Sequence, residues 1–308
     1  MTDALPALPA RTVDGHKGTF GTVLVVGGQA SSPRMMIGGP AFTALAALRS
    51  GCGLAVLALP EPILSEGLTI APSATGLALP VDDDGHIRPS EAAQRIDDAR
   101  GGVRCFAVGP GLGLGNAQQQ LLVWLLARDD MPVVVDADGI NNLATLEHAL
   151  ADVRAPAIFT PHPGEYARLA ASLGIHLDGV DESTRVPAAE QLAQRLGAVV
   201  VLKGRHTVVS DGVRTVVNET GNAVLATAGT GDILTGIIAG LVAQFVHPLM
   251  AGGAPNALGL FECAQLGVHL HGVVADVWAA THGDAGLLAT DLLDGLPTAM
   301  HALRAGSN

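Results

Sequence analysis

The segment AGTGDILTGIIAGL places a threonine between two glycines, directly before an aspartate and a long apolar run. Gly229 and Gly231 carry no side chains, so the backbone around Thr230 can fold with its N–H groups pointing outward. The apolar spacing that follows Asp232 predicts a helix over 232–246, whose start carries a partial positive charge. Gly229, Thr230 and Gly231 are therefore predicted to form an anion hole with the Asp232 carboxylate at its edge.

Asp232 has two interpretations. Aspartate is a common N-cap, so its side chain could simply accept hydrogen bonds from the first turn of the helix. Alternatively, a carboxylate beside an anion hole can take the proton of a hydroxyl while the hole holds a transferring phosphoryl group. The second interpretation predicts an enzyme of phosphoryl transfer.

Lysine is rare in this chain. Of 17 basic residues only two are lysines, Lys17 and Lys203, and glycine follows each of them. A compact ammonium beside a tight turn is typical of phosphate sites, but in an arginine-rich chain the same placement also arises by chance.

Short apolar runs recur along the chain, as is typical of parallel strands covered on both faces. They occupy 21–28, 54–60, 105–111, 132–138, 157–164 and 198–204, and helical patterns lie between them at 40–50, 90–100, 116–128, 165–173 and 186–196. The alternation predicts an α/β fold with a parallel sheet. A hairpin is expected over 206–217 with its turn at Asp211-Gly212, before a mainly helical last third.

Ligands of such folds bind at the carboxyl ends of the strands, where several polar residues stand. Asp136 and Asp138 could bind Mg²⁺ through water or cap the following segment. Glu165 could serve the first turn of a helix or a metal-linked role. The loop GPGLGLGN lacks the third glycine that a dinucleotide fingerprint requires, so a redox dinucleotide fold is not supported there. His269 and His271 do not share a helix face, which argues against a metal pair.

Composition excludes several classes of protein. A net charge of −12 and 3% aromatic residues argue against nucleic-acid binding. The apolar run Ile233–Phe245 is too short to span a bilayer, which needs about 20 residues. Three cysteines without CxxC spacing, after an N-terminus without a secretion signal, predict a cytoplasmic protein.

Seven ordered segments resemble the signature segments of ADP- or ATP-dependent NAD(P)H-hydrate dehydratases, which belong to the ribokinase-like superfamily. They are HKGTFGTVLVVGG (16–28), ALRSGCGL (47–54), VGPGLG (108–113), DAD (136–138), TPHPGE (160–165), LKGRHTVV (202–209) and GNAVLATAGTGDILTGIIAGL (221–241). The resemblance implies a single ribokinase-like domain over 16–308 after an N-terminal extension, 1–15. Its expected architecture is a three-layer sandwich with a mostly parallel central sheet flanked by helices.

The same resemblance implies repair of NADH or NADPH that has been hydrated on the nicotinamide ring. The family phosphorylates the added hydroxyl with ADP or ATP, with Mg²⁺ as cofactor, and then eliminates phosphate. Asp232 would be the general base. The residues that match nucleotide-binding positions are Lys203, Gly204, Arg205, His206, Thr207 and Gly231, and those that match substrate-binding positions are Gly39, Gly111, Gly113, His162 and Asp232. Metal ligands stay unassigned, as do roles for Lys17 and Asn222.

The chain departs from the family pattern at two positions. Gly39 stands where relatives typically have alanine, so a backbone contact to substrate would survive but a methyl contact would not. Ala228 stands where glycine is usual, a mild change if its φ is negative and a costly one otherwise. His162 lies between two prolines and could also be a plain loop residue.

Two other functions remain open. A small-molecule kinase of the same superfamily, such as a vitamin-precursor kinase, needs the same base and anion hole but releases a phosphorylated product. A nucleotide-sensing protein would tolerate loss of the carboxylate, so the presence of Asp232 argues against it. The resemblance also implies a homo-oligomer and, because only about 15 residues precede the first matching segment, a separate epimerase protein in the same pathway.

Overall fold

A computed structural model describes residues 5–146, 153–250 and 257–306, without the side chains of 247–250. Its strands are β1 (Thr22–Val26), β2 (Leu54–Pro60), β3 (Thr75–Leu79), β4 (Val103–Val108), β5 (Val133–Val135), β6 (Ala157–Phe159), β7 (Val199–Leu202), β8 (Val208–Ser210) and β9 (Thr215–Val217). Its α-helices are α1 (Gly38–Arg49), α2 (Leu64–Ile70), α3 (Pro89–Ala99), α4 (Asn116–Leu126), α5 (Asp138–Leu143), α6 (Pro163–Ser172), α7 (Arg185–Leu196), α8 (Thr230–Met250), α9 (Leu260–His282) and α10 (Ala289–Ala305).

The described strands form one sheet in the order β3-β2-β1-β4-β5-β6-β7-β8-β9. All neighbours from β3 to β7 are parallel, and β8 and β9 continue the sheet as antiparallel strands. The predicted α/β fold with a mostly parallel sheet is thus confirmed.

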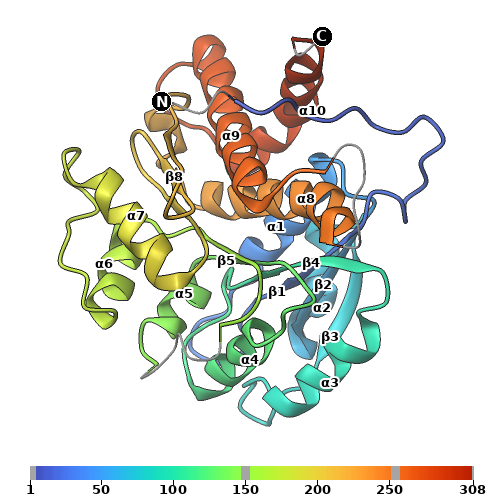
Figure 1. The fold of residues 1–308 in the computed structure, drawn as a ribbon. Coiled ribbons are helices and arrows are strands. Elements are labelled where there is room, and N and C mark those ends of the chain that lie inside the picture. Colours follow the sequence, from blue (N-terminus) through green and yellow to red (C-terminus); the bar gives the residue numbers. More distant parts are fainter. Residues whose placement is uncertain (1–4, 147–152, 251–256, 307–308) are drawn as a thin grey trace.

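Helices cover both faces of this sheet and make a three-layer sandwich (Figure 1). Successive strand residues point to opposite faces, so Val23 and Val25 belong to one apolar cluster while Leu24 and Val26 belong to the other. The first cluster packs under α1, α8, α9 and α10, and the second packs under α3, α4, α6 and α7. Burial on both faces explains why the strands are continuously apolar in sequence.

The predicted element pattern is mostly correct but incomplete. The short elements β3, α2 and α5 were not predicted from the amino-acid pattern. Helix α8 begins at Thr230, two residues before the predicted start. The hairpin is confirmed, with Asp211 and Gly212 between β8 and β9.

The described part of the N-terminal extension packs against the rest of the chain. Leu8 is buried in the apolar cluster that α8–α10 share. The Arg11 guanidinium donates to the carbonyl of Gly51, and Arg304 donates to that of Pro9. These contacts fasten the segment to α10 and to the turn before β2.

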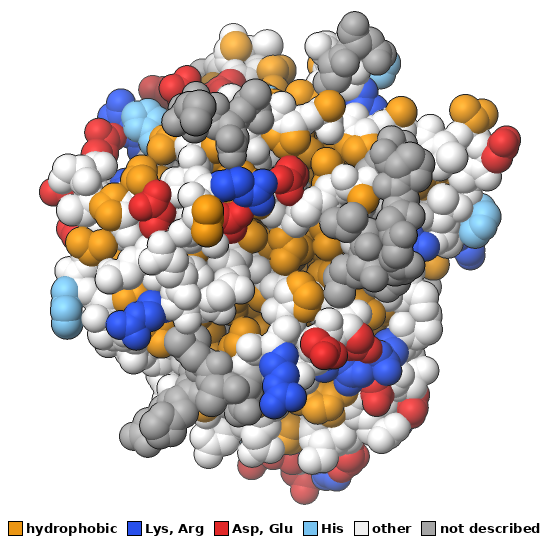
Figure 2. Space-filling model, viewed as in Figure 1, with side chains coloured by type: hydrophobic (Ala, Val, Ile, Leu, Met, Phe, Trp, Pro, Cys, Tyr) orange, Lys and Arg blue, Asp and Glu red, His pale blue; other side chains and the backbone are white. Residues whose placement is uncertain are grey.

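The surface carries mixed charge. Figure 2 shows acidic and basic side chains interspersed over the face viewed, with hydrophobic side chains gathered near its centre. Among the described helices, none combines the length and the hydropathy that a membrane-spanning segment requires.

Candidate active site

Three neighbouring strands place charged side chains at one edge of the sheet. Asp136 follows β5, Lys203 follows β7, and Glu165 lies in α6 directly after β6. These strands are adjacent and parallel, so their carboxyl ends meet at this edge. The N-terminus of α8 lies at the same place, since the Lys203 ammonium would be 3.4 Å from a Cβ atom placed on Gly231.

Asp136 holds Lys203. The Lys203 ammonium donates to Asp136 Oδ1 at 2.7 Å, and the Thr235 hydroxyl donates to Asp136 Oδ2 at 2.7 Å. Asp136 is only 1% exposed, and each of its carboxylate oxygens already accepts a hydrogen bond. Its side chain therefore does not cap the following helix, and both of its oxygens are engaged in holding Lys203 and Thr235. Burial lowers the pKa of Lys203, but the carboxylates of Asp136 and Glu165 outweigh burial and raise it, so the ammonium stays charged.

Asp138 orders the glycine-rich loop. Its Oδ2 accepts a hydrogen bond of 2.9 Å from the N–H of Gly113, and Asn142 pairs with the N–H of Gly115 and the carbonyl of Gly113. Gly111 has a φ of 59° and Gly113 a φ of 78°. Such angles favour glycine, so the loop requires these residues for its shape whether or not it also faces a ligand.

Asp232 lies in the first turn of α8 and does not cap it. The helix starts at Thr230, and within the described residues no group donates a hydrogen bond to the Asp232 carboxylate. The N-cap interpretation is therefore wrong. A Cβ atom on Gly39 would lie 3.1 Å from Asp232 Oδ1, so the glycine leaves room beside the carboxylate that alanine would take up.

The pKa of Asp232 is raised to about 7, first by burial and then by the charge of Asp136, while Lys203 opposes the rise. A carboxylate with a pKa near the working pH is a better proton acceptor than an ordinary aspartate, because it is more basic and still substantially ionised.

The start of α8 offers unpaired backbone donors. Within the described residues the N–H groups of Gly231 and Asp232 have no acceptor, whereas that of Thr230 donates weakly to the carbonyl of Thr227. The Thr230 hydroxyl donates to the carbonyls of Leu225 and Thr227, so it fixes the preceding turn rather than facing a ligand. The unpaired amides are therefore those of Gly231 and Asp232, which overlap the predicted anion hole of Gly229, Thr230 and Gly231 only at Gly231, and anion binding there stays a prediction.

Two neighbouring positions explain the glycine pattern at this turn. Gly229 has a φ of 91°, which favours glycine. Ala228 does not have a positive φ, so alanine in place of the glycine that is usual here causes no backbone strain.

His162 is the N-cap of α6. Its Nδ1 accepts from the N–H of Gly164 at 3.0 Å, and its Nε2 lies 3.2 Å from Glu165 Oε1. The other oxygen of Glu165 accepts the His162 N–H at 2.8 Å, which completes a capping box. Both ring nitrogens are engaged, so His162 offers a ligand its half-exposed ring rather than a free nitrogen.

Glu165 links this cap to the charged cluster. The carboxyl is buried, and its Oε2 lies 3.9 Å from the Lys203 ammonium. Burial raises the pKa of Glu165 to about 7, although Lys203 lowers it. Glu165 thus serves the first turn of α6 through the capping box, which is one of the two interpretations drawn from the sequence.

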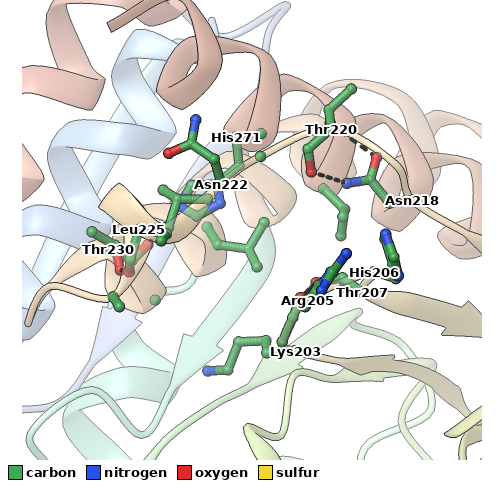
Figure 3. Close-up of a pocket in the computed structure, with 18 of the residues that line it drawn as sticks. Lys203, Arg205, His206, Thr207, Asn218, Thr220, Asn222, Leu225, Thr230 and His271 are labelled. Atoms are coloured by element: carbon green, nitrogen blue, oxygen red, sulfur yellow. Dashed lines mark hydrogen bonds between the residues drawn. The ribbon is translucent and has the colours of Figure 1, made fainter. Parts of the chain in front are cut away.

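A pocket of about 690 Å³ opens beside the start of α8. It is lined by all five residues of the predicted nucleotide segment, Lys203, Gly204, Arg205, His206 and Thr207, and by Thr230 and Gly231. Figure 3 shows Lys203, Arg205 and Thr207 on one side of this pocket, with Asn222 and Thr230 across from them. None of the predicted substrate positions lines this pocket. Asp232 is the residue after the pocket-lining Gly231, and Gly39 lies beside the Asp232 carboxylate.

Some pocket residues had no predicted role. The Nε2 of His271 lies 2.9 Å from the carbonyl of Thr230, and burial lowers the pKa of His271 to about 4. A neutral ring donates its N–H to that carbonyl, so His271 fastens the anion-hole turn to α9. Thr235 was missed as well, because an isolated threonine in an apolar helix carries no signal in sequence.

Two residues with unassigned roles can now be placed. Asn222 accepts the N–H of Val224 and donates to Asp276 Oδ1 at 2.8 Å, which fixes the loop before α8 to α9. The backbone of Lys17 packs against Gly53 at the start of β2, the opposite end of the sheet from the site, and its side chain is exposed. Of the two lysines, only Lys203 lies at the site.

Among the described residues no group of three or more histidine, cysteine or acidic side chains is arranged to hold a metal. Each Asp136 oxygen already accepts one hydrogen bond. These residues fit Mg²⁺ as an ion carried mainly by nucleotide phosphates, the manner in which proteins commonly bind it.

Comparison with known proteins agrees with this geometry. The family model for NAD(P)H-hydrate dehydratase matches residues 23–298. An ADP-dependent (S)-NAD(P)H-hydrate dehydratase of Neisseria meningitidis is 39% identical over 288 residues, which are 92% of this chain and 86% of that protein. A bifunctional NAD(P)H-hydrate repair enzyme of Salinibacter ruber is 40% identical over 294 residues, 94% of this chain but 50% of its own length. The chain thus spans about half the length of that relative.

A solved structure is similar over nearly the whole chain. The ADP/ATP-dependent NAD(P)H-hydrate dehydratase of Bacillus subtilis, co-crystallised with ATP and Mg²⁺, has a TM-score of 0.76 and 30% identity, with 96% of this chain and 95% of that one covered. The extent of the family match, together with these relatives, shows that the chain belongs to the NAD(P)H-hydrate dehydratase family.

Proposed function

We propose that the chain is a hydro-lyase that dehydrates hydrated NADH or NADPH at the expense of ADP or ATP. The observation that carries the proposal is the Asp232 carboxylate, which accepts no hydrogen bond from the described residues and lies beside the unpaired N–H groups at the start of α8. The relative from Neisseria meningitidis carries the name of this activity.

The nucleotide is proposed to occupy the pocket lined by 203–207, with its terminal phosphoryl group at the anion hole. The N–H groups of Gly231 and Asp232 would donate to its oxygens, and the Lys203 ammonium, held by Asp136, would neutralise part of its charge. Phosphoryl transfer depends mainly on such positioning and charge stabilisation. Mg²⁺ would add neutralisation on the nucleotide phosphates.

Asp232 is proposed to accept the proton of the ring hydroxyl. The hydroxyl oxygen then bonds to the phosphorus as the bond from phosphorus to the nucleotide oxygen breaks. Phosphate next leaves the ring carbon, with the electron pair of the ring nitrogen assisting, and loss of a proton from the neighbouring carbon restores the ring double bond. Phosphate leaves more readily than hydroxide, which is why phosphorylation precedes elimination. Gly39, beside the carboxylate, and the loop with Gly111 and Gly113 are proposed to contact the dinucleotide.

The test is incubation of the protein with hydrated NADH and either ADP or ATP. We expect the absorbance of reduced nicotinamide to recover and free phosphate to appear in equal amount. Asp232→Asn should lower turnover at least about 10²-fold, the usual contribution of a general base, while nucleotide affinity stays nearly intact. Lys203→Ala should weaken nucleotide binding.

Three outcomes would reject parts of the proposal. Recovery of absorbance without any nucleotide would exclude phosphoryl transfer. A stable phosphorylated product without free phosphate would indicate a small-molecule kinase instead. Normal turnover in Asp232→Asn would remove the assigned base.

We further propose that residues 16–308 form one domain, that the chain forms a homo-oligomer, and that it works with an epimerase acting on the same hydrated dinucleotide. The bifunctional relative described above supports a functional link between the dehydratase and a second repair activity. Light scattering coupled to gel filtration measures the oligomer, and a monomeric mass at micromolar concentration would reject it.

A further inference from the structure

Arg185 is a buried cation with an unusual position. It is 5% exposed and is the first residue of α7, where a positive charge is disfavoured by the helix dipole. Within the described residues no carboxylate lies within ion-pair distance of it, although the charge of Glu182 favours the cation, and its Nε is buried without a hydrogen-bond partner. Placing such a charge in the interior costs several kcal/mol unless its contacts compensate.

The hydrogen bonds of the Arg185 guanidinium all go to backbone carbonyls, one of which belongs to the pocket-lining residue Lys203. One terminal nitrogen donates to the carbonyl of Gly179 at 2.8 Å. The other donates to the carbonyls of Leu202 at 2.9 Å and of Lys203 at 3.3 Å. The side chain therefore ties the loop before α7 to the end of β7, where the predicted nucleotide segment starts.

The segment that Arg185 supports has an unusual backbone, which is strained at one residue. Gly204 has a φ of 141° and His206, which is not a glycine, has a φ of 53°. Glycine adopts a positive φ without a steric penalty, but at His206 such a conformation costs about 1–3 kcal/mol and persists only when the surroundings enforce it. A Cβ atom on Gly204 would lie 3.0 Å from the Arg185 guanidinium, so the turn folds directly over that group.

The same turn determines where the Lys203 ammonium stands. Its backbone is held on one side by the bond from the Lys203 N–H to the carbonyl of Pro161 and on the other by Arg185. The ammonium then reaches Asp136 at 2.7 Å, beside Gly231. Releasing the carbonyls of Leu202 and Lys203 would loosen both the pocket wall and the ammonium.

We propose that Arg185 is a positioning residue for nucleotide binding, which fixes the turn 203–207 and so presents Lys203 to the nucleotide phosphates. Its buried positive charge lies directly behind Gly204 and adds to the attraction for those phosphates. The proposal rests on the proposed use of ADP or ATP, and it assigns no contact between Arg185 and the hydrated dinucleotide.

The experiment compares Arg185→Gln, Arg185→Lys and Arg304→Gln with the unaltered chain. ADP and ATP binding is measured by titration calorimetry, KM values for nucleotide and for hydrated NADH are measured separately, and melting temperatures check the fold. Arg304 is the matched control because its guanidinium is also partly buried and donates to a carbonyl, that of Pro9, but it lies in α10 away from the pocket.

We expect Arg185→Gln to weaken nucleotide binding about tenfold, which corresponds to one lost charged hydrogen bond, and to raise the KM for nucleotide similarly. The KM for hydrated NADH should change less than about twofold, and Arg185→Lys should recover part of the loss because it keeps the charge. Arg304→Gln should leave nucleotide affinity unchanged.

Equal losses for Arg185→Gln and Arg304→Gln, or equal rises in both KM values, would assign Arg185 a merely structural role and overturn the proposal. If Arg185→Gln does not fold, Arg185→Lys decides, and an unaltered nucleotide affinity in that variant overturns it. Absence of ADP and ATP binding by the unaltered chain would instead reject the proposed function itself, and this inference with it.

Discussion

The chemistry of Asp232 depends on two opposing influences. Burial and the neighbouring Asp136 charge favour its protonated form, and the Lys203 ammonium favours the ionised form. The first pair prevails, so the pKa rises to about 7, above the ordinary value of about 3.8. The carboxylate is then a stronger base than an ordinary aspartate, at the cost of being partly protonated at neutral pH.

The pH dependence of the reaction follows from this balance. A general base must lose its proton to act, so kcat/KM should rise with pH and level off above a midpoint of about 7. Asp136→Asn removes a negative neighbour and should move that midpoint to lower pH, with a reduced plateau because Lys203 loses its partner.

The measurement is a pH–rate profile between pH 5 and 9. Asp130→Asn is the matched control, since it makes the same chemical change before β5, at the opposite end of the strand from Asp136. It should leave the midpoint unaltered. A profile already flat from pH 5.5 upward would contradict the raised pKa of Asp232.

At the scale of the element, two glycines stand at the start of α8 for different reasons. The backbone at Gly229 requires glycine, whereas the backbone at Gly231 does not. Gly229 has a φ of 91°, and a Cβ atom there would lie 3.0 Å from the Cβ of Ala289 and 3.1 Å from the ring of Phe42. Gly231 has an ordinary helical backbone, and a Cβ atom there would make a normal contact of 3.4 Å with the Lys203 ammonium. The first glycine is needed for the fold, whereas the second leaves space over the amides.

Alanine substitutions separate these two requirements. Gly231→Ala should leave stability unchanged or raise it by up to about 1 kcal/mol, because alanine favours helix, yet weaken nucleotide binding by covering the anion hole. Gly229→Ala should lower the free energy of unfolding by at least about 1 kcal/mol through backbone strain and crowding.

Chemical denaturation and nucleotide titration of both variants check this prediction. A Gly231→Ala protein that binds ATP or ADP normally would show that the phosphoryl group does not approach these amides.

At the scale of the molecule, one sheet carries both apolar clusters. Along each strand, successive residues point alternately into the cluster under α8–α10 and the cluster under α3–α7. Both clusters would therefore be exposed to solvent if the sheet opened. The site takes residues that directly follow β5 and β7, together with the start of α8, and would be lost with the sheet.

This arrangement predicts a single cooperative unfolding transition in scanning calorimetry. Nucleotide at 100 times its dissociation constant should stabilise the whole chain by about 2.7 kcal/mol and move the entire transition upward. Two separate transitions, with only one of them shifted by nucleotide, would contradict the one-domain proposal.

The amino-acid sequence by itself determined the class of fold and the central feature of the site. Continuously apolar strands are the direct consequence of burial on both faces, so the parallel sheet was predictable. The strand β3, TGLAL, was not, because it is short, edge-located and half exposed. The carboxylate at the start of α8 was visible because glycines, aspartate and helix are consecutive in the chain.

Only the tertiary structure decided which charges meet. Lys203 and Asp136 are 67 residues apart, and Thr235 and Asp136 are 99 apart. Whether such residues meet depends on the strand order and on which helix covers the sheet edge, and local patterns contain neither. For the same reason Lys17 was found at the opposite end of the sheet, Asp138 was found to hold a loop, and Arg185 emerged as a support for the nucleotide segment.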